Sequence, residues 1–215
     1  MFRHSILVFA ASALLLSAPV QAAIFMFDSD PFAGSDALMT PGRQIVGGEP
    51  SISFSTASDV FAFDTGIFGL SDNITFANDV VGSLPQDANV VVLRTFDNDG
   101  DPGTPFSAGT AASLIADQIT YSNPGFFVYF NSGLDLARLV YSTDLSYSDS
   151  DLKILARLTN FEGQAGRDDM ATFTAANFDF VATPVPEPAS FVLLASGVGV
   201  LVGRLLKQRR RRTAA

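Results

Sequence analysis

The chain has 215 residues and a formal net charge of −9, with no cysteine and one histidine, His4. The lack of cysteine excludes a disulfide framework and Cys-His nucleophilic sites. A lone histidine at the extreme N-terminus gives no support to Ser-His-Asp catalysis or to a zinc or copper site. The acidic balance repels phosphates, so nucleic acid is not an expected partner.

Residues 1–22 have the three-part layout of a secretory signal peptide. Arg3 stands in a short basic start, an apolar stretch runs from Ile6 to Leu16, and Val20 and Ala22 precede a cut before Ala23. The apolar stretch is shorter than the roughly 20 residues that a membrane-spanning helix needs. We therefore expect export and a mature domain over residues 23–183.

Residues 23–183 hold six cationic and twenty-one acidic residues, a balance of −15. A segment of about 160 residues suffices for one domain with its own core. Without disulfides, that domain must depend on its core, with bound ions as a further source of stability.

Short runs of alternating or dense apolar residues predict strands over most of this domain. Alternation marks half-buried strands, and runs of branched and aromatic residues mark inner ones. The predicted strands cover residues 51–55, 59–64, 73–78, 89–96, 125–130, 137–142 and 151–159. The last of these places Leu152, Ile154, Ala156 and Leu158 on one face.

Helical spacing is clear only over residues 110–119, and residues 173–178 could hold one helical turn. Seven or more short strands with one short helix predict a mainly β fold. The expected arrangement is an antiparallel β-sandwich or a jelly roll.

Asp64-Thr65-Gly66 follows an apolar strand and resembles the catalytic turn of aspartic proteases. That chemistry needs two aspartates that share one proton. No second Asp-Thr-Gly or Asp-Ser-Gly occurs in the chain. A chance tripeptide at a strand end is therefore the favoured interpretation.

Asp97, Asp99 and Asp101 alternate with Asn98 and Gly100. Carboxylates at every second position of a turn can converge on Ca²⁺, which takes about six to eight oxygen ligands. The match to an EF-hand loop is incomplete, because no glutamate closes it at the twelfth position. The alternatives are a calcium site and an ordinary solvated turn.

A third acidic stretch, residues 142–151, contains Asp144, Asp149 and Asp151. It could complete a cation site, but a polar hairpin loop is the more common structure for such residues. Paired carboxylates for glycoside hydrolysis remain open. The domain has only two glutamates and no tryptophan to stack on a sugar, so support for a carbohydrate enzyme is poor.

The C-terminal segment has three parts. Prolines alternate over 184–188, which suits an extended linker that can join neither helix nor sheet. Residues 189–206 carry Arg204 as their only charge and predict a transmembrane helix about 27 Å long. The tail, residues 207–215, should stay cytoplasmic; the cations predicted to hold it there are Arg204, Lys207, Arg209, Arg210, Arg211 and Arg212.

Together, Val185-Pro186-Glu187-Pro188, the apolar run and the arginine block resemble the PEP-CTERM sorting signal. The resemblance covers about residues 184–212 only. It implies export in a bacterium with a Gram-negative envelope, processing by an exosortase, which is a membrane-embedded cysteine peptidase, and an association with extracellular polysaccharide and biofilms. It implies nothing about the domain that is sorted.

The sequence therefore predicts a non-enzymatic, exported surface or matrix protein. It would be held transiently in the membrane through residues 189–206 and finally lie at the cell surface or outside the cell. The predicted partners are an exosortase and extracellular polysaccharide, and the one predicted cofactor is Ca²⁺ at Asp97–Asp101. The alternative is an exported hydrolase that uses aspartate carboxylates.

Overall fold

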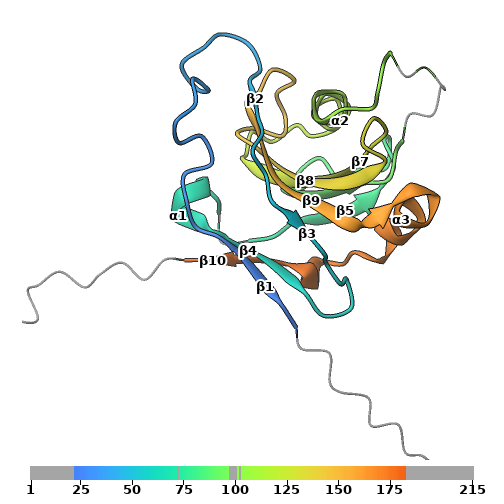
Figure 1. The fold of residues 1–215 in the computed structure, drawn as a ribbon. Helices are drawn as coiled ribbons and strands as arrows, with labels where there is room; N and C mark the ends of the chain where they lie inside the picture. The colour runs from blue at the N-terminus through green and yellow to red at the C-terminus, as the bar shows by residue number, and fades with distance from the viewer. Residues whose placement is uncertain (1–21, 72, 97–100, 102, 183–215) are drawn as a thin grey trace, which may run out of the picture. The chain divides into compact units, whose positions relative to one another are not determined.

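Two β-sheets organise the domain in the computed structural model, which describes residues 22–71, 73–96, 101 and 103–182 (Figure 1). The smaller sheet has the order β1-β4-β10, formed by Ile24–Phe27, Val60–Asp64 and Phe178–Val181. Both of its pairings are parallel and join segments distant in the chain: Ile24 lies opposite Val60, and Phe178 opposite Phe61.

The larger sheet has seven strands in the order β2-β9-β8-β7-β6-β5, with β3 also paired to β9. These strands are β2 (Ile45–Val46), β3 (Ser51–Ile52), β5 (Phe76–Asp79), β6 (Val90–Leu93), β7 (Gly125–Asn131), β8 (Leu136–Ser142) and β9 (Leu152–Glu162). Only the β7-β8 and β8-β9 pairs are antiparallel. The other four pairings of this sheet are parallel.

Helices and turns connect these strands. They are α1 (Thr65–Phe68), α2 (Ala108–Ala116), α3 (Gly163–Asp169) and the 3₁₀ turns η1 (Met170–Thr172) and η2 (Ala175–Asn177). The predicted helix over 110–119 corresponds to α2, and the helical turn predicted within 173–178 corresponds to η2. The side chain of Ser107 caps α2 by accepting a hydrogen bond from the N–H of Thr110.

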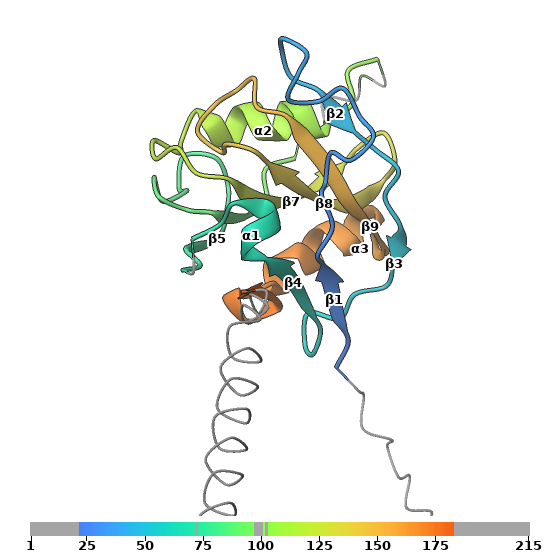
Figure 2. The same ribbon diagram turned by 90° about the vertical axis from the view of Figure 1, so that its left-hand side faces the viewer.

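The larger sheet separates two hydrophobic cores because the side chains of an inner strand alternate between its faces. Val90, Val92, Phe126 and Val128 point to the core shared with the small sheet, which contributes Phe61, Phe63 and Phe178. Val91, Leu93, Phe127 and Tyr129 belong to the core beneath α2. Figure 2 shows α2 and the small sheet on opposite sides of the large one.

Aromatic rings fill the core between the two sheets. Phe63 stacks on Phe126 with their ring centroids 3.6 Å apart, and Phe61 stacks on Phe54 at 4.0 Å. Each of these four rings is at most 1% exposed. Aromatic pairs add roughly 0.5–1.5 kcal/mol each beyond the area that they bury.

The structure confirms the mainly β fold and corrects its finer description. The predicted antiparallel pairing is wrong for the small sheet, whose two pairings are both parallel, and it holds for only two of the six pairings of the large sheet. The prediction of one short helix is also wrong, because the described residues contain α1, α2 and α3. Local sequence patterns indicate that a strand forms, but they do not indicate which distant strand it pairs with.

The predicted single apolar face of β9 is also wrong. Leu152 and Ile154 belong to the core beneath α2, whereas Ala156 and Leu158 belong to the core between the sheets. Leu139 pairs with Ala156 and the next residue, Val140, pairs with Ile154, so Leu155 is an extra residue in the ladder. Such a β-bulge exchanges the two faces of the strand from that point on.

Candidate functional site

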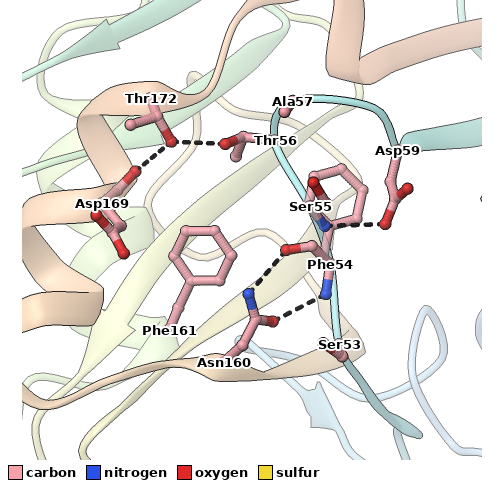
Figure 3. Close-up of a pocket in the computed structure, with 10 residues that line it drawn as sticks. All are labelled: Ser53, Phe54, Ser55, Thr56, Ala57, Asp59, Asn160, Phe161, Asp169 and Thr172. Carbon is pink, nitrogen blue, oxygen red and sulfur yellow. Dashed lines mark hydrogen bonds between the residues drawn. The ribbon is translucent and has the colours of Figure 1, made fainter. Parts of the chain in front are cut away.

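A polar cavity of about 370 Å³ opens where the loop before β4 meets the end of β9 and η1 (Figure 3). Its lining residues are Ser53, Phe54, Ser55, Thr56, Ala57, Asp59, Asn160, Phe161, Asp169 and Thr172. Phe54 and Phe161 are among these residues but are only 1% and 3% exposed. A bound molecule would meet hydroxyl, amide and carboxylate groups together with apolar surface.

Asp59 is the buried carboxylate of this cavity, at 7% exposure. Its Oδ1 accepts hydrogen bonds from the backbone N–H of Ala23 at 3.0 Å and from the Ser58 hydroxyl at 2.9 Å. Its Oδ2 accepts one from the N–H of Ser55 at 2.9 Å. Burial alone would raise the pKa of Asp59, but these three bonds outweigh it and lower the pKa, which suits a permanent anion rather than a general acid.

Three other polar side chains of the cavity, Asn160, Thr56 and Thr172, are also bonded within the chain. The Asn160 amide pairs with the backbone of Phe54 through two hydrogen bonds of 2.8 Å, in the manner of a strand neighbour. The hydroxyl of Thr56 lies 2.7 Å from that of Thr172, which donates to the carbonyl of Asp169. These bonds join the loop to β9 and η1, so the geometry of the cavity is fixed by the fold.

A second cavity, of about 530 Å³, is lined by Val80, Arg94, Phe96, Gln164, Arg167, Asp168 and Ala171. The Arg167 guanidinium lies over the Phe96 ring, 4.1 Å from its centroid, and donates to the Gln164 side chain at 2.6 Å. Arg94 pairs with Asp79 at 3.2 Å. With Arg94 already paired, the Arg167 guanidinium beside the aromatic ring is the group that can bind a carboxylate-bearing sugar.

Glu49 forms the centre of a buried ion-pair group. Its side chain is 1% exposed and accepts hydrogen bonds from Arg138 on β8 and from Nε of Arg157 on β9, the latter at 2.7 Å. Burial would raise the pKa of Glu49, but the bonds from Arg157, its own backbone and Arg138 lower it. The group fastens the segment between β2 and β3 to the large sheet, which is a structural role.

The predicted calcium site falls largely outside the described residues. Asp97 and Asp99 are not described, and the described Asp101 accepts a hydrogen bond from the N–H of Gly103 at 2.8 Å. Within the part of the chain that the structure describes, no three acidic, histidine or cysteine side chains gather as a metal centre would require. The calcium hypothesis for Asp97, Asp99 and Asp101 stays a prediction.

Asp64 of the Asp-Thr-Gly tripeptide caps α1. Its Oδ1 accepts a hydrogen bond of 3.0 Å from the N–H of Ile67, and Gly69 ends the helix in the left-handed conformation at φ 64°. The tripeptide thus marks the start of a short helix after β4, in line with the strand-end interpretation.

Two aspartates of the 142–151 stretch accept hydrogen bonds from backbone N–H groups. Asp151, 8% exposed, accepts the N–H groups of Leu38 and Gln44, each at 2.7 Å. Leu38 has a φ of 68°, so Asp151 fixes a loop residue in a strained conformation. Asp144 accepts from the hydroxyl of Ser122 and from Ser146. Burial would raise the pKa of Asp144, but these bonds lower it.

The sorting residues Val185, Pro186, Glu187 and Pro188, the predicted transmembrane helix 189–206 and the basic tail lie outside the described residues. Among the helices that are described, none combines the length and apolar character required to cross a membrane.

Comparison of the chain with family models, with curated proteins and with solved structures gave no match. The resemblance of residues 184–212 to the PEP-CTERM signal therefore rests on those residues alone. Sequence reasoning missed Asp59 and Glu49 as key carboxylates. The only available signal was their position at or just before the start of a predicted strand, and turn residues commonly stand there as well.

Proposed function

We propose that the chain is an exported surface or extracellular-matrix protein, sorted through its C-terminal segment and without catalytic activity of its own. The observation that carries this proposal is the order of Val185-Pro186-Glu187-Pro188, an apolar run of helical length and five cations within residues 207–212. An N-terminal segment with the layout of a signal peptide supports the same route.

The described domain supports a binding or structural module better than a hydrolase. Its buried aspartates, Asp59, Asp64 and Asp151, each accept hydrogen bonds from backbone N–H groups of the chain itself. The lowered pKa of Asp59 opposes the role of proton donor that carboxylate-based hydrolysis demands. No specific observation favours the hydrolase alternative.

Extracellular polysaccharide is the partner that we propose, and the cavity of Arg94, Phe96 and Arg167 is its best-suited contact. Arg167 forms no salt bridge with any described residue, so it presents a local positive charge to a ligand carboxylate on a domain that is otherwise acidic. Arg167→Gln should weaken binding to a uronate-rich polysaccharide and leave binding to a neutral glucan unchanged. Equal binding of both variants to the acidic polymer would contradict this contact.

Intact mass in an exosortase-producing host tests the sorting proposal. The expected mature species lacks residues 1–22 and the arginine block. A matched variant, Glu187→Gln, removes the charge from the motif and should accumulate with its tail attached. A mature wild-type chain that keeps Lys207 through Arg212 in such a host would contradict the processing.

Calcium binding by Asp97, Asp99 and Asp101 is part of the same proposal. Thermal unfolding with excess calcium and with chelator tests it. A ligand at a hundred times its dissociation constant stabilises a protein by about 2.7 kcal/mol. The expected result is a higher melting temperature with calcium, lost in Asp99→Asn. An unchanged melting temperature would identify 97–101 as an ordinary turn.

A further inference from the structure

Ala23, the residue after the predicted signal-peptide cut, is held by both of its backbone groups. Its N–H donates to Oδ1 of Asp59 at 3.0 Å, and its carbonyl accepts from the N–H of Val60 at 2.9 Å. Parallel pairing of β1 with β4 then begins at once, with Ile24 opposite Val60. The nitrogen that cleavage would release is therefore already fixed against a carboxylate.

Asp59 lacks a cationic partner among the described residues. Its donors are two backbone N–H groups and the Ser58 hydroxyl, all of them neutral. At 7% exposure, neutral donors alone stabilise this anion and already outweigh the cost of its burial, so a cationic donor would stabilise it further.

We propose that signal-peptide cleavage between Ala22 and Ala23 creates an α-ammonium group on Ala23 that forms an ion pair with Asp59, so that export processing completes the fold. This inference rests on the proposed export. A signal peptidase hydrolyses the peptide bond with one water: the leader keeps the Ala22 carboxylate, and the released amine on Ala23 takes up a proton.

The nitrogen need not move for this pair to form, because the amide N–H of the precursor already occupies the donor position. Cleavage changes only the charge of the donor, and charge-assisted hydrogen bonds are roughly twice as strong as neutral ones. Ala23 is only half-buried, so the two remaining ammonium protons can be solvated by water.

The neighbouring charges are few. Asp169 is the other titratable group that lines the cavity. Arg167 on α3 lies over Phe96 and Phe130 instead. From η2, the uncharged amide of Asn177 donates to the backbone carbonyls of Thr56 and Asp59.

The pair has a defined pH window. An α-amino group has an ordinary pKa of about 7.7–8.0, and pairing raises it. Its contribution is therefore fully present below about pH 8 and is lost as the pH rises through the raised value. The pKa of Asp59 is lowered, so its contribution is present above about pH 4 and is lost as the pH falls through that lowered value.

The test compares two chains in mild detergent: 23–215, with a free amine on Ala23, and 20–215, whose amine lies three residues away. Each is prepared with Asp59 and as Asp59→Asn. At pH 6.5 we expect the unfolding equilibrium constant of 23–215 to be about tenfold smaller than that of 20–215. Asp59→Asn should abolish this difference, and so should pH 10.5, where the amine is neutral.

Equal stability of the two chains at pH 6.5 would overturn the ion pair, as would a difference that persists at pH 10.5. An equal loss in both chains on Asp59→Asn would show that Asp59 only accepts loop hydrogen bonds. If Asp59→Asn does not fold, the pH series on the two parent chains decides the question alone.

N-terminal sequencing of the protein from producing cells separates this proposal from export itself. An uncleaved chain in those cells would contradict export. A secreted chain that begins at Ala23 but shows no pH-dependent difference would contradict the ion pair alone.

Discussion

Glu49→Gln tests whether the buried ion-pair group fastens the loop between β2 and β3 to the large sheet. Glutamine keeps the shape of the side chain but removes the negative charge between two guanidinium groups. Arg138, whose side chain is 13% exposed, would then remain in the protein without a counter-ion. Its Nε already has no hydrogen-bond partner, so its charge depends heavily on Glu49.

The magnitude follows from the exposure of the two partners. Removing one member of a buried pair costs about 3–5 kcal/mol, whereas an exposed pair is worth about 0–1 kcal/mol. Arg138 belongs to the first class and Arg157, at 44% exposure, mostly to the second. We therefore expect Glu49→Gln to lower the free energy of unfolding by about 3 kcal/mol at pH 7.

Urea unfolding of chain 23–215 in mild detergent measures this loss, with Glu162→Gln as the matched control. Glu162, the other glutamate of the domain, is exposed and belongs to none of the described salt bridges, so its substitution should change stability by less than about 0.5 kcal/mol.

The pH dependence has a definite sign. Because the pKa of Glu49 is lowered, its contribution is present above the ordinary value of about 4.3 and disappears as the pH falls through the folded-state value. The difference between the parent and Glu49→Gln chains should therefore shrink as the pH falls below the ordinary value, and the two should converge only below the folded-state pKa of Glu49. A loss under about 1 kcal/mol at pH 7, or a difference that grows in acid, would refute the reasoning.

Two further substitutions test the packing. Phe63→Ala removes a ring that is 0% exposed and stacked on Phe126, so it should lower the free energy of unfolding by about 3–5 kcal/mol. The control, Ile24→Ala, changes a position that is 69% exposed and should cost little. Equal losses of the two variants in denaturant titrations would contradict the assigned core. Gly166→Ala would place a Cβ 2.1 Å from the backbone carbon of Phe161, so the free energy of unfolding should fall by about 1–3 kcal/mol. The control, Gly47→Ala, should have a small effect, because its Cβ would meet the Glu49 side chain at an ordinary 3.5 Å. A melting temperature unchanged by Gly166→Ala would contradict the close packing of α3 on β9.

Local patterns predicted individual strands well where burial is regular. The dense apolar runs at 89–96 and 125–130 became β6 and β7, whose residues are all buried because both faces of the sheet are covered. The alternating run at 151–159 became β9, but its bulge at Leu155 depends on how β8 pairs with it and leaves no mark in the sequence.

The strands that the sequence did not predict are short or adjoin a segment that was predicted to be something else. Ile24–Phe27 directly follows the predicted leader, and Ile45–Val46 has only two residues. Phe178–Val181 begins where a helical turn was expected. Parallel pairing of β4 with both β1 and β10 requires segments more than thirty residues apart to meet, which alternation cannot specify.

The aspartates explain why the candidate site was harder to predict than the fold. In sequence, Asp-rich stretches suggest cation sites or solvated turns, because both use the same residues. In the structure, Asp59 joins Ala23 to Ser55 and Asp151 joins Leu38 and Gln44 to β9, so each carboxylate cross-links segments through backbone N–H groups.

Such cross-links have a consequence for a domain without cysteine. A carboxylate that accepts two or three N–H bonds is stable as an anion across neutral pH, and it fixes a loop without any metal or disulfide. Their contribution is lost only when the carboxylates become protonated, since the pKa of Asp59 and that of Asp144 are both lowered. The acidity of the domain thus has an internal structural role at these positions, and only the remaining exposed aspartates need an explanation in terms of partners.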